Sequence, residues 1–215
     1  MERAEPWALQ QLIAGAPRDW LAAARKYAFQ KPVHHATLVI DSFDVPIQRQ
    51  GRKRNCSSPY WSAKLNRPGW RFMVIADALM QVQYPSNGYS PKIYDGHWVQ
   101  ARQDTIESTF KHGIFLADGH FHEGEAFDEV QFLVPSREHP VRPEENEDPD
   151  MEKLIKWEVK RNKAIRRARA RVELTIHQIK APWKVLSVPW SEELNQLSYV
   201  MHVAAAVHNA KHNLN

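Results

Sequence analysis

Two stretches of the chain, Leu38-Val39-Ile40-Asp41 and Phe115-Leu116-Ala117-Asp118, share a pattern, because each is a short apolar run that breaks at an aspartate. A short, continuous apolar run of this kind is typical of a strand buried inside a sheet. In α/β sheets, ligand sites assemble at the edge where such strands end. A single aspartate there more often caps a turn or a helix. Two such aspartates together favour a ligand-binding site at this edge of the sheet.

The apolar pattern along the rest of the chain alternates between strands and helices. Predicted strands cover residues 36–40, 71–76, 79–82, 114–117 and 131–134, and predicted helices cover 98–110, 151–179 and about 192–210. Residues 84–92 are punctuated by proline and glycine and predict a loop. The helix over 151–179 carries one apolar stripe, and Pro182 is expected to end it. This order predicts a mixed α/β sheet with helices on both faces.

The 215 residues suggest one domain or at most two. We expect a short helical N-terminal segment over residues 1–35, a main domain over 36–188 with an acidic loop at 138–150, and a C-terminal helix within 189–215. A packing role suits the N-terminal helices best, and a DNA-reading helix-turn-helix is the alternative. The single cysteine, Cys56, excludes an internal disulfide and a cysteine-rich zinc site. No apolar run approaches a membrane span of roughly 18 residues, and no signal peptide is evident, so we expect an intracellular, soluble protein.

A third carboxylate, Glu173, lies on the longest predicted helix, on a basic face beside the apolar stripe. Arg169 precedes it by one helical turn, so a solvent-exposed ion pair between them is the simpler interpretation. The functional alternative is a carboxylate that holds a metal ion beside a phosphate backbone. Carboxylate oxygens suit Mg²⁺ or Mn²⁺, and two such ions can activate a water and stabilise the leaving oxygen of a phosphodiester.

Histidines and basic runs offer further candidates. His120 and His122, next to Asp118, could share zinc, but matching further ligands are missing, and a solvated loop is the better interpretation. His34, His35, His208 and His212 are expected at the surface or the chain end. The basic runs at 49–54 and 160–171 could bind DNA phosphates or act as nuclear localisation signals, with a solvated helix face as the alternative for the second run. We therefore predict a nuclear protein, with the cytoplasm as the other possibility.

A series of short blocks, taken in order, resembles the catalytic domain of Harbinger-type DDE transposases over residues 36–188. The blocks lie at residues 40–47, 60–64, 74–77, 85–95, 116–121, 134–135 and 162–180. The resemblance implies an RNase H-like fold, a mixed sheet flanked by helices. It places the first aspartate on the first strand, the second aspartate after the fourth strand and the glutamate on a late helix.

The same resemblance implies functional residues and partners. Asp41, Asp118 and Glu173 correspond to the metal-binding, catalytic triad, with Asp95 as a weaker further ligand. Two divalent cations, Mg²⁺ or Mn²⁺, and a DNA substrate follow from it, as does a separate Myb-like protein for DNA targeting. Candidate DNA contacts are the basic residues Arg49, Arg52, Lys53, Arg54, Lys64, Arg166, Arg169 and Lys180.

Two functions stay open at this stage. The first is a metal-dependent endonuclease of the DDE transposase type. The second is a catalytically inactive, domesticated relative that binds DNA or another partner on the same scaffold. Departures from the family pattern favour this second function, for example Ser42-Phe43 where the family has Gly-Thr. The functions differ in whether Asp41, Asp118 and Glu173 come within about 4–8 Å of one another, close enough to share a metal pair. The oligomeric state is not predicted.

Overall fold

The structure is a computed structural model that describes residues 29, 31–48, 58–119, 121, 127–136 and 149–213. The strands are β1 (Leu38–Pro46), β2 (Trp61–Ser62), β3 (Arg67–Asp77), β4 (Val82–Pro85), β5 (Ile114–Leu116) and β6 (Gln131–Leu133). The helices are α3 (Asp95–Gln100), α4 (Gln103–Thr109), α5 (Pro149–Lys180) and α6 (Leu194–Asn213), with a 3₁₀ turn, η2, at Lys184–Leu186. None of the helices in these ranges is long and apolar enough to cross a membrane.

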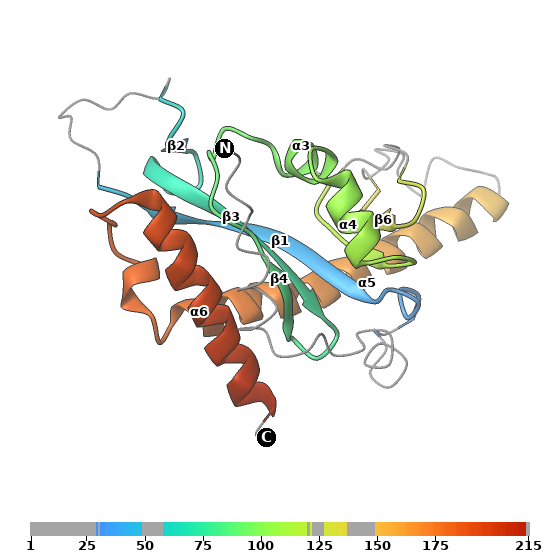
Figure 1. The fold of residues 1–215 in the computed structure, drawn as a ribbon. Coiled ribbons are helices and arrows are strands. Elements are labelled where there is room, and N and C mark those ends of the chain that lie inside the picture. The colour runs from blue at the N-terminus through green and yellow to red at the C-terminus, as the bar shows by residue number, and fades with distance from the viewer. Residues whose placement is uncertain are drawn as a thin grey trace.

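β1 is the central strand of one mixed, six-stranded sheet (Figure 1). The order across the sheet is β2-β3-β1-β5-β6, and β4 pairs with β3. β1 and β3 run antiparallel, whereas β5 is parallel to both β1 and β6. The predicted fold class, an RNase H-like mixed sheet flanked by helices, is confirmed.

Alternate side chains of β1 point to opposite faces of the sheet and serve two separate cores. Val39, Phe43 and Val45 belong to a core that includes residues of α5 and α6. Leu38 and Ile40 belong to a second core that includes residues of α3 and α4. Figure 1 shows α3 and α4 on the other side of β1 from α6. Burial on both faces explains the continuous apolar run in the sequence.

β1 is longer than predicted, because it continues past Asp41 to Pro46. Its antiparallel pairing with β3 extends from Leu38, opposite Asp77, to Pro46, opposite Gly69. Asp41 is therefore in the middle of the strand and not at its end. It is also the one β1 residue that is not fully buried.

Two other predicted boundaries are wrong for local reasons. Residues 78–81 form a turn between β3 and β4, because Asp77 Oδ1 accepts hydrogen bonds from the backbone N–H groups of Leu79 and Gln81. β4 then occupies part of the predicted loop. The predicted helix over 98–110 is two short helices, and the N–H of Arg102 bonds to the carbonyl of Val99, which closes the first of them.

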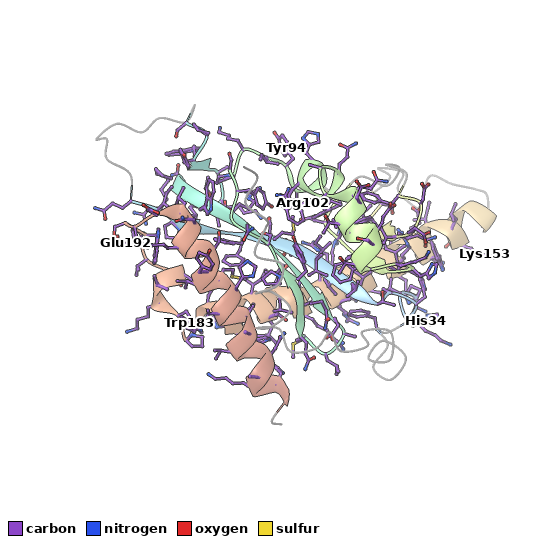
Figure 2. The ribbon with its side chains drawn as sticks, in the orientation of Figure 1. His34, Tyr94, Arg102, Lys153, Trp183 and Glu192 are labelled. Atoms are coloured by element: carbon purple, nitrogen blue, oxygen red, sulfur yellow. The ribbon has the colours of Figure 1, made fainter. Side chains whose placement is uncertain are left out.

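The long helix α5 is confirmed, and among its described side chains the buried ones begin at Asn162. Asn162, Ile165 and Val172 are buried, whereas Val159 is exposed. The first turns extend beyond the sheet, with Lys153 on the projecting end (Figures 1 and 2). The predicted N-terminal segment over 1–35 lies almost entirely outside the described residues, as does most of the acidic loop at 138–150. These two parts of the domain division stay predictions.

Two histidines of α6 are buried, although we expected His208 at the surface. His202 and His208 are each 6% exposed. His202 Nε2 lies 3.0 Å from Asn87 Oδ1, and His208 Nε2 lies 2.8 Å from the carbonyl oxygen of Met80. Burial lowers the pKa of both imidazoles, that of His202 to about 4. Because unfolding restores the ordinary pKa of 6.5, the unfolded chain binds more protons in this interval, and stability falls as the pH falls.

We predict that His202 alone removes about 2 kcal/mol of unfolding free energy between pH 7 and pH 5. His202→Gln retains a donor for Asn87 but does not titrate, so its stability should depend less on pH. His97→Gln, at an exposed position of α3, is the control and should behave like the wild type. Urea denaturation at the two pH values measures the difference. Equal pH dependence in wild type and His202→Gln would contradict the assignment.

Candidate functional site

The pairing of β1 with β5 brings Asp41 and Asp118 together. The parallel register places Leu38 opposite Phe115 and Val39 opposite Leu116. The same offset, continued past the end of β5, sets Asp41 opposite Asp118. Since adjacent parallel strands lie about 4.8 Å apart, the two side chains leave the sheet at neighbouring positions.

Arg169 of α5 lies between the two carboxylates. Its Nη2 donates a hydrogen bond to Asp118 Oδ2 at 3.2 Å and lies 3.7 Å from Asp41 Oδ2. Both contacts share one nitrogen, so the two carboxylates face a common point that accommodates a positive charge. The side chains of Arg169 and Asp41 are 12% and 14% exposed, whereas that of Asp118 is 42% exposed. The site is therefore open to solvent on the Asp118 side.

The electrostatics of this pair are only partly balanced. Burial raises the pKa of Asp41 above its ordinary value, and the nearby Arg169, the backbone amide of Ser42 and Lys64 offset only part of that effect. Arg169 also has a buried Nε donor without a hydrogen-bond partner in the described part of the chain. A buried donor left unsatisfied carries a free-energy cost. The single charge of the guanidinium therefore offsets only one of the two aspartate charges, and the guanidinium is itself not fully hydrogen-bonded.

Glu173 lies one turn after Arg169 on α5 but is exposed. Among the described residues it makes no ion pair with Arg169, whose partners are Asp41 and Asp118. No three His, Cys, Asp or Glu side chains within the described ranges are close enough to hold one metal ion. The structure thus brings together the two aspartates of the predicted triad, and Glu173 does not join them.

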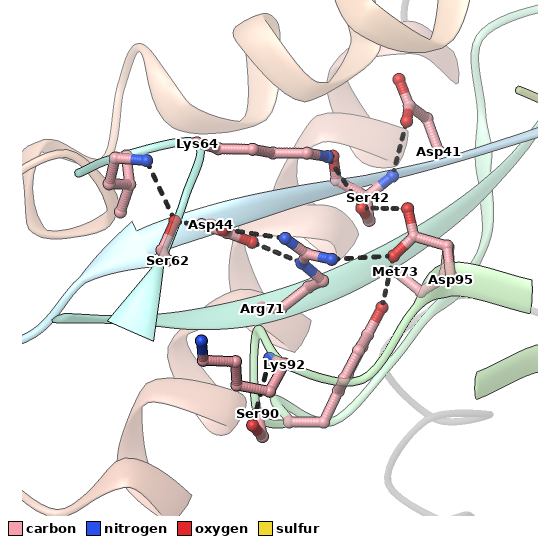
Figure 3. A network of polar contacts seen from close by, with 12 residues as sticks. Asp41, Ser42, Asp44, Ser62, Lys64, Arg71, Met73, Ser90, Lys92 and Asp95 are labelled. Atoms are coloured by element: carbon pink, nitrogen blue, oxygen red, sulfur yellow. Dashed lines mark hydrogen bonds and ion pairs between the residues drawn. The ribbon is translucent and has the colours of Figure 1, made fainter. Parts of the chain in front are cut away.

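Asp95 belongs to a different feature, a buried polar network on the α3 side of β1 (Figure 3). Arg71 of β3 donates two hydrogen bonds to Asp44, from Nε to Oδ1 at 2.7 Å and from Nη2 to Oδ2 at 3.1 Å. Its Nη1 donates to Asp95 Oδ1 at 3.2 Å. Burial alone would lower the pKa of Arg71, but these two carboxylates raise it above its ordinary value. Asp95 therefore has a structural cation already.

Ser42 links this network to Asp41. Its Oγ donates to Asp95 Oδ2 at 2.7 Å, and its backbone N–H donates to Asp41 Oδ1 at 2.8 Å. Lys64 Nζ donates to the backbone carbonyl and to Oγ of Ser42, both at 3.1 Å. Sequence reasoning did not assign Ser42, Asp44 and Arg71 to the site. The sequence did contain one indication of their role, because polar residues occupy positions within otherwise apolar strands, where the side chains are expected to be buried.

The candidate DNA contacts fall into different environments. Lys64 and Arg166 are exposed. Lys180 is half-buried, with Nζ 5.2 Å from the centre of the Phe43 ring, and burial lowers its pKa. The bases of the run at 49–54, together with His120 and His122, lie outside the described residues. Their roles stay predictions.

We predict that Arg71→Met destabilises the protein by about 3–5 kcal/mol, because it leaves Asp44 and Asp95 buried without their cation. Lys111→Gln removes one partner of an exposed ion pair with Glu129 and should cost less than about 1 kcal/mol. Chemical denaturation of both variants measures the contrast. A loss for Arg71→Met no larger than that of the control would show that the network does not stabilise the fold.

Comparison with known proteins places this geometry in a family context. Residues 40–209 match the family model described as DDE superfamily endonuclease. The matched span begins in β1, ends in α6, and contains Asp41, Asp118 and Glu173. No curated protein and no solved structure matches the chain significantly.

Proposed function

Because the chain belongs to the DDE superfamily endonucleases, we propose that it cleaves phosphodiester bonds in DNA with Asp41 and Asp118 at the catalytic centre. One observation carries the proposal: both carboxylates contact the same guanidinium nitrogen of Arg169. Asp41 lies on β1 and Asp118 follows β5, and the two carboxylates face one point beside solvent-exposed surface. Such convergence is what a cation site in a nuclease requires.

The two aspartates fit a divalent cation, because carboxylate oxygens are the ligands that Mg²⁺ and Mn²⁺ prefer. The position of Arg169 supports this fit, since it shows that a positive charge is accommodated between them. When bound, such cations would supply charge neutralisation and an activated water. Glu173 is proposed as a further ligand from its family position alone.

The residues around the pair suggest distinct contributions. Asp118 is the more exposed carboxylate and is therefore the one that an incoming phosphate would reach first. Ser42 holds Asp41 through its backbone N–H and is itself held by Asp95 and Lys64. The exposed bases Lys64 and Arg166 suit contacts with DNA phosphates. A Harbinger-type ancestry and a Myb-like targeting partner belong to this proposal through the sequence blocks. A nuclear location belongs to it through the basic runs at 49–54 and 160–171.

A second function, DNA binding without cleavage, is favoured by a different observation. Glu173, the third carboxylate of the predicted triad, is exposed, and within the described ranges it does not join the two aspartates. Arg169 already contacts both of them. A scaffold that keeps this arrangement permanently would bind DNA and not cut it.

We predict that the protein nicks supercoiled DNA in the presence of Mn²⁺ or Mg²⁺, and that Asp118→Asn reduces nicking to the level seen with chelator. Removing one carboxylate charge lowers the attraction of the pair for a divalent cation. Asp104→Asn, at an exposed position of α4, is the matched control and should nick like the wild type. Equal nicking by wild type and Asp118→Asn would overturn the site. Absence of nicking with intact DNA binding would select the second function.

We also predict that Arg169→Gln binds Mn²⁺ about tenfold more tightly than the wild type, because the guanidinium and the metal compete for the same carboxylates. Arg166→Gln removes an exposed charge one turn earlier on α5 and controls for the loss of charge. Isothermal titration calorimetry without DNA measures binding independently of cleavage. Affinity of Arg169→Gln equal to or weaker than that of Arg166→Gln would show that the two cations do not compete.

A further inference from the structure

α5 has a second basic surface, on the flank away from Arg169. A groove of about 550 Å³ lies there, and among the described residues its lining includes five cationic side chains and no acidic one. The cations are Lys31, Lys160, Lys163, Arg167 and Arg171. We call this feature the basic groove. It shares no lining residue with the Asp41–Asp118 pair.

Helix geometry explains why one basic run serves two surfaces. Lys160, Lys163, Arg167 and Arg171 recur at spacings of three and four residues, so they align along one face of α5. Arg169 is two residues from both Arg167 and Arg171, a rotation of about 200° around the helix axis. The run at 160–171 is therefore divided, with Arg169 directed to the carboxylates and the aligned bases directed to the basic groove.

The floor of the basic groove is fixed by packing. Phe29 and Ala168 are buried. The guanidinium carbon of Arg171 lies 5.3 Å from the centre of the Phe29 ring, and its Nη1 donates to the carbonyl oxygen of Ala78 at 3.0 Å. A carbonyl contact orients Arg171 but leaves its charge unneutralised. Lys160, Lys163 and Arg167 are exposed above this floor, and no carboxylate within the described ranges forms an ion pair with them.

We propose that the basic groove is a second binding site for nucleic acid, one that holds the phosphate backbone away from the carboxylate pair. The aligned cations extend over roughly 16 Å of helix axis. Phosphates of a duplex strand succeed one another at about 3.4 Å, so several of them fall within that length. Such contacts to the backbone would fix the position of DNA without reading its sequence.

The shape and charge of the basic groove favour a nucleic acid over an acidic protein segment. Protein interfaces draw most of their binding energy from a few buried anchors, chiefly Trp, Tyr and Arg, that fill well-packed pockets. The apolar floor here, Phe29 and Ala168, is already buried within the fold. A continuous row of a single charge sign instead complements a polyanion of regular spacing. The choice of DNA as the ligand rests on the proposed function, but the groove itself does not depend on catalysis.

The test is DNA binding by the triple variant Lys160→Gln/Lys163→Gln/Arg167→Gln. A matched control, Lys92→Gln/Lys111→Gln/Lys184→Gln, removes the same charge from exposed positions elsewhere. Fluorescence anisotropy of a labelled 20-base-pair duplex, measured in chelator over a range of KCl concentrations, gives the salt dependence of the binding constant. We expect the slope of log K against log salt to become shallower by about 2 to 3 in the groove variant, and to change little in the control.

Each other outcome overturns the proposal. Equal slopes in the two triple variants would show that the basic groove does not contact phosphates. The same anisotropy assay with labelled poly-glutamate tests an acidic protein segment as the ligand. If the groove variant lost binding to poly-glutamate but bound DNA like the control, the basic groove would be a site for an acidic protein partner. Because the assay contains chelator, its result is independent of nicking. Failure of the proposed nuclease activity is thus distinguishable from failure of the basic groove.

Discussion

β1 is buried on both faces and yet carries Asp41, Ser42 and Asp44 in its middle. Burying a carboxylate without a partner is costly, so each of these side chains needs a hydrogen bond or a cation. The alternation of the strand sends Asp41 toward α5 and sends Ser42 and Asp44 toward α3. A different arginine supplies the positive charge on each face: Arg169 beside Asp41 and Arg71 beside Asp44. Arg71 stabilises the fold, and Arg169 belongs to the candidate site.

The two arginines differ in how easily another cation could replace them. Arg71 makes three hydrogen bonds to Asp44 and Asp95 inside the sheet, all of them buried. Among the described residues, Arg169 makes a single hydrogen bond, to a carboxylate that is substantially exposed, and its Nε has no partner there. Arg71 thus has the arrangement of a permanent structural counter-ion. Arg169 has that of a counter-ion which a metal could displace.

Local sequence patterns were enough to predict the parts of the fold that depend on local burial. The apolar runs that end at Asp41 and Asp118 correctly predicted the strands β1 and β5. The apolar stripe that precedes Pro182 correctly predicted the helix α5. The strand predicted at 79–82 failed because Asp77 binds the backbone of the following turn, which is a matter of geometry and not of composition. The contact of Arg71 with Asp44 joins positions on two paired strands, so only the register reveals it.

The candidate site, too, could be predicted from the sequence only in part. The sequence placed Arg169 and Glu173 on one side of a helix, one turn apart. Packing of α5 against β1 brought Arg169 to the carboxylates and left Glu173 in solvent. The division of the basic run likewise depends on how the helix is rotated against the sheet. The spacing of residues along a helix predicts which side chains share a face of that helix. Only the tertiary structure shows what that face contacts.

We infer that Asp41 and Asp118 form a cation site that Arg169 occupies when no metal is bound. The most direct measurement is the anomalous difference map of a crystal grown or soaked with Mn²⁺. We expect a peak between the two carboxylates, with the Arg169 guanidinium displaced from its contacts with both. A structure that retains both Arg169 contacts, with the peak elsewhere or absent at the same Mn²⁺ concentration, would contradict it.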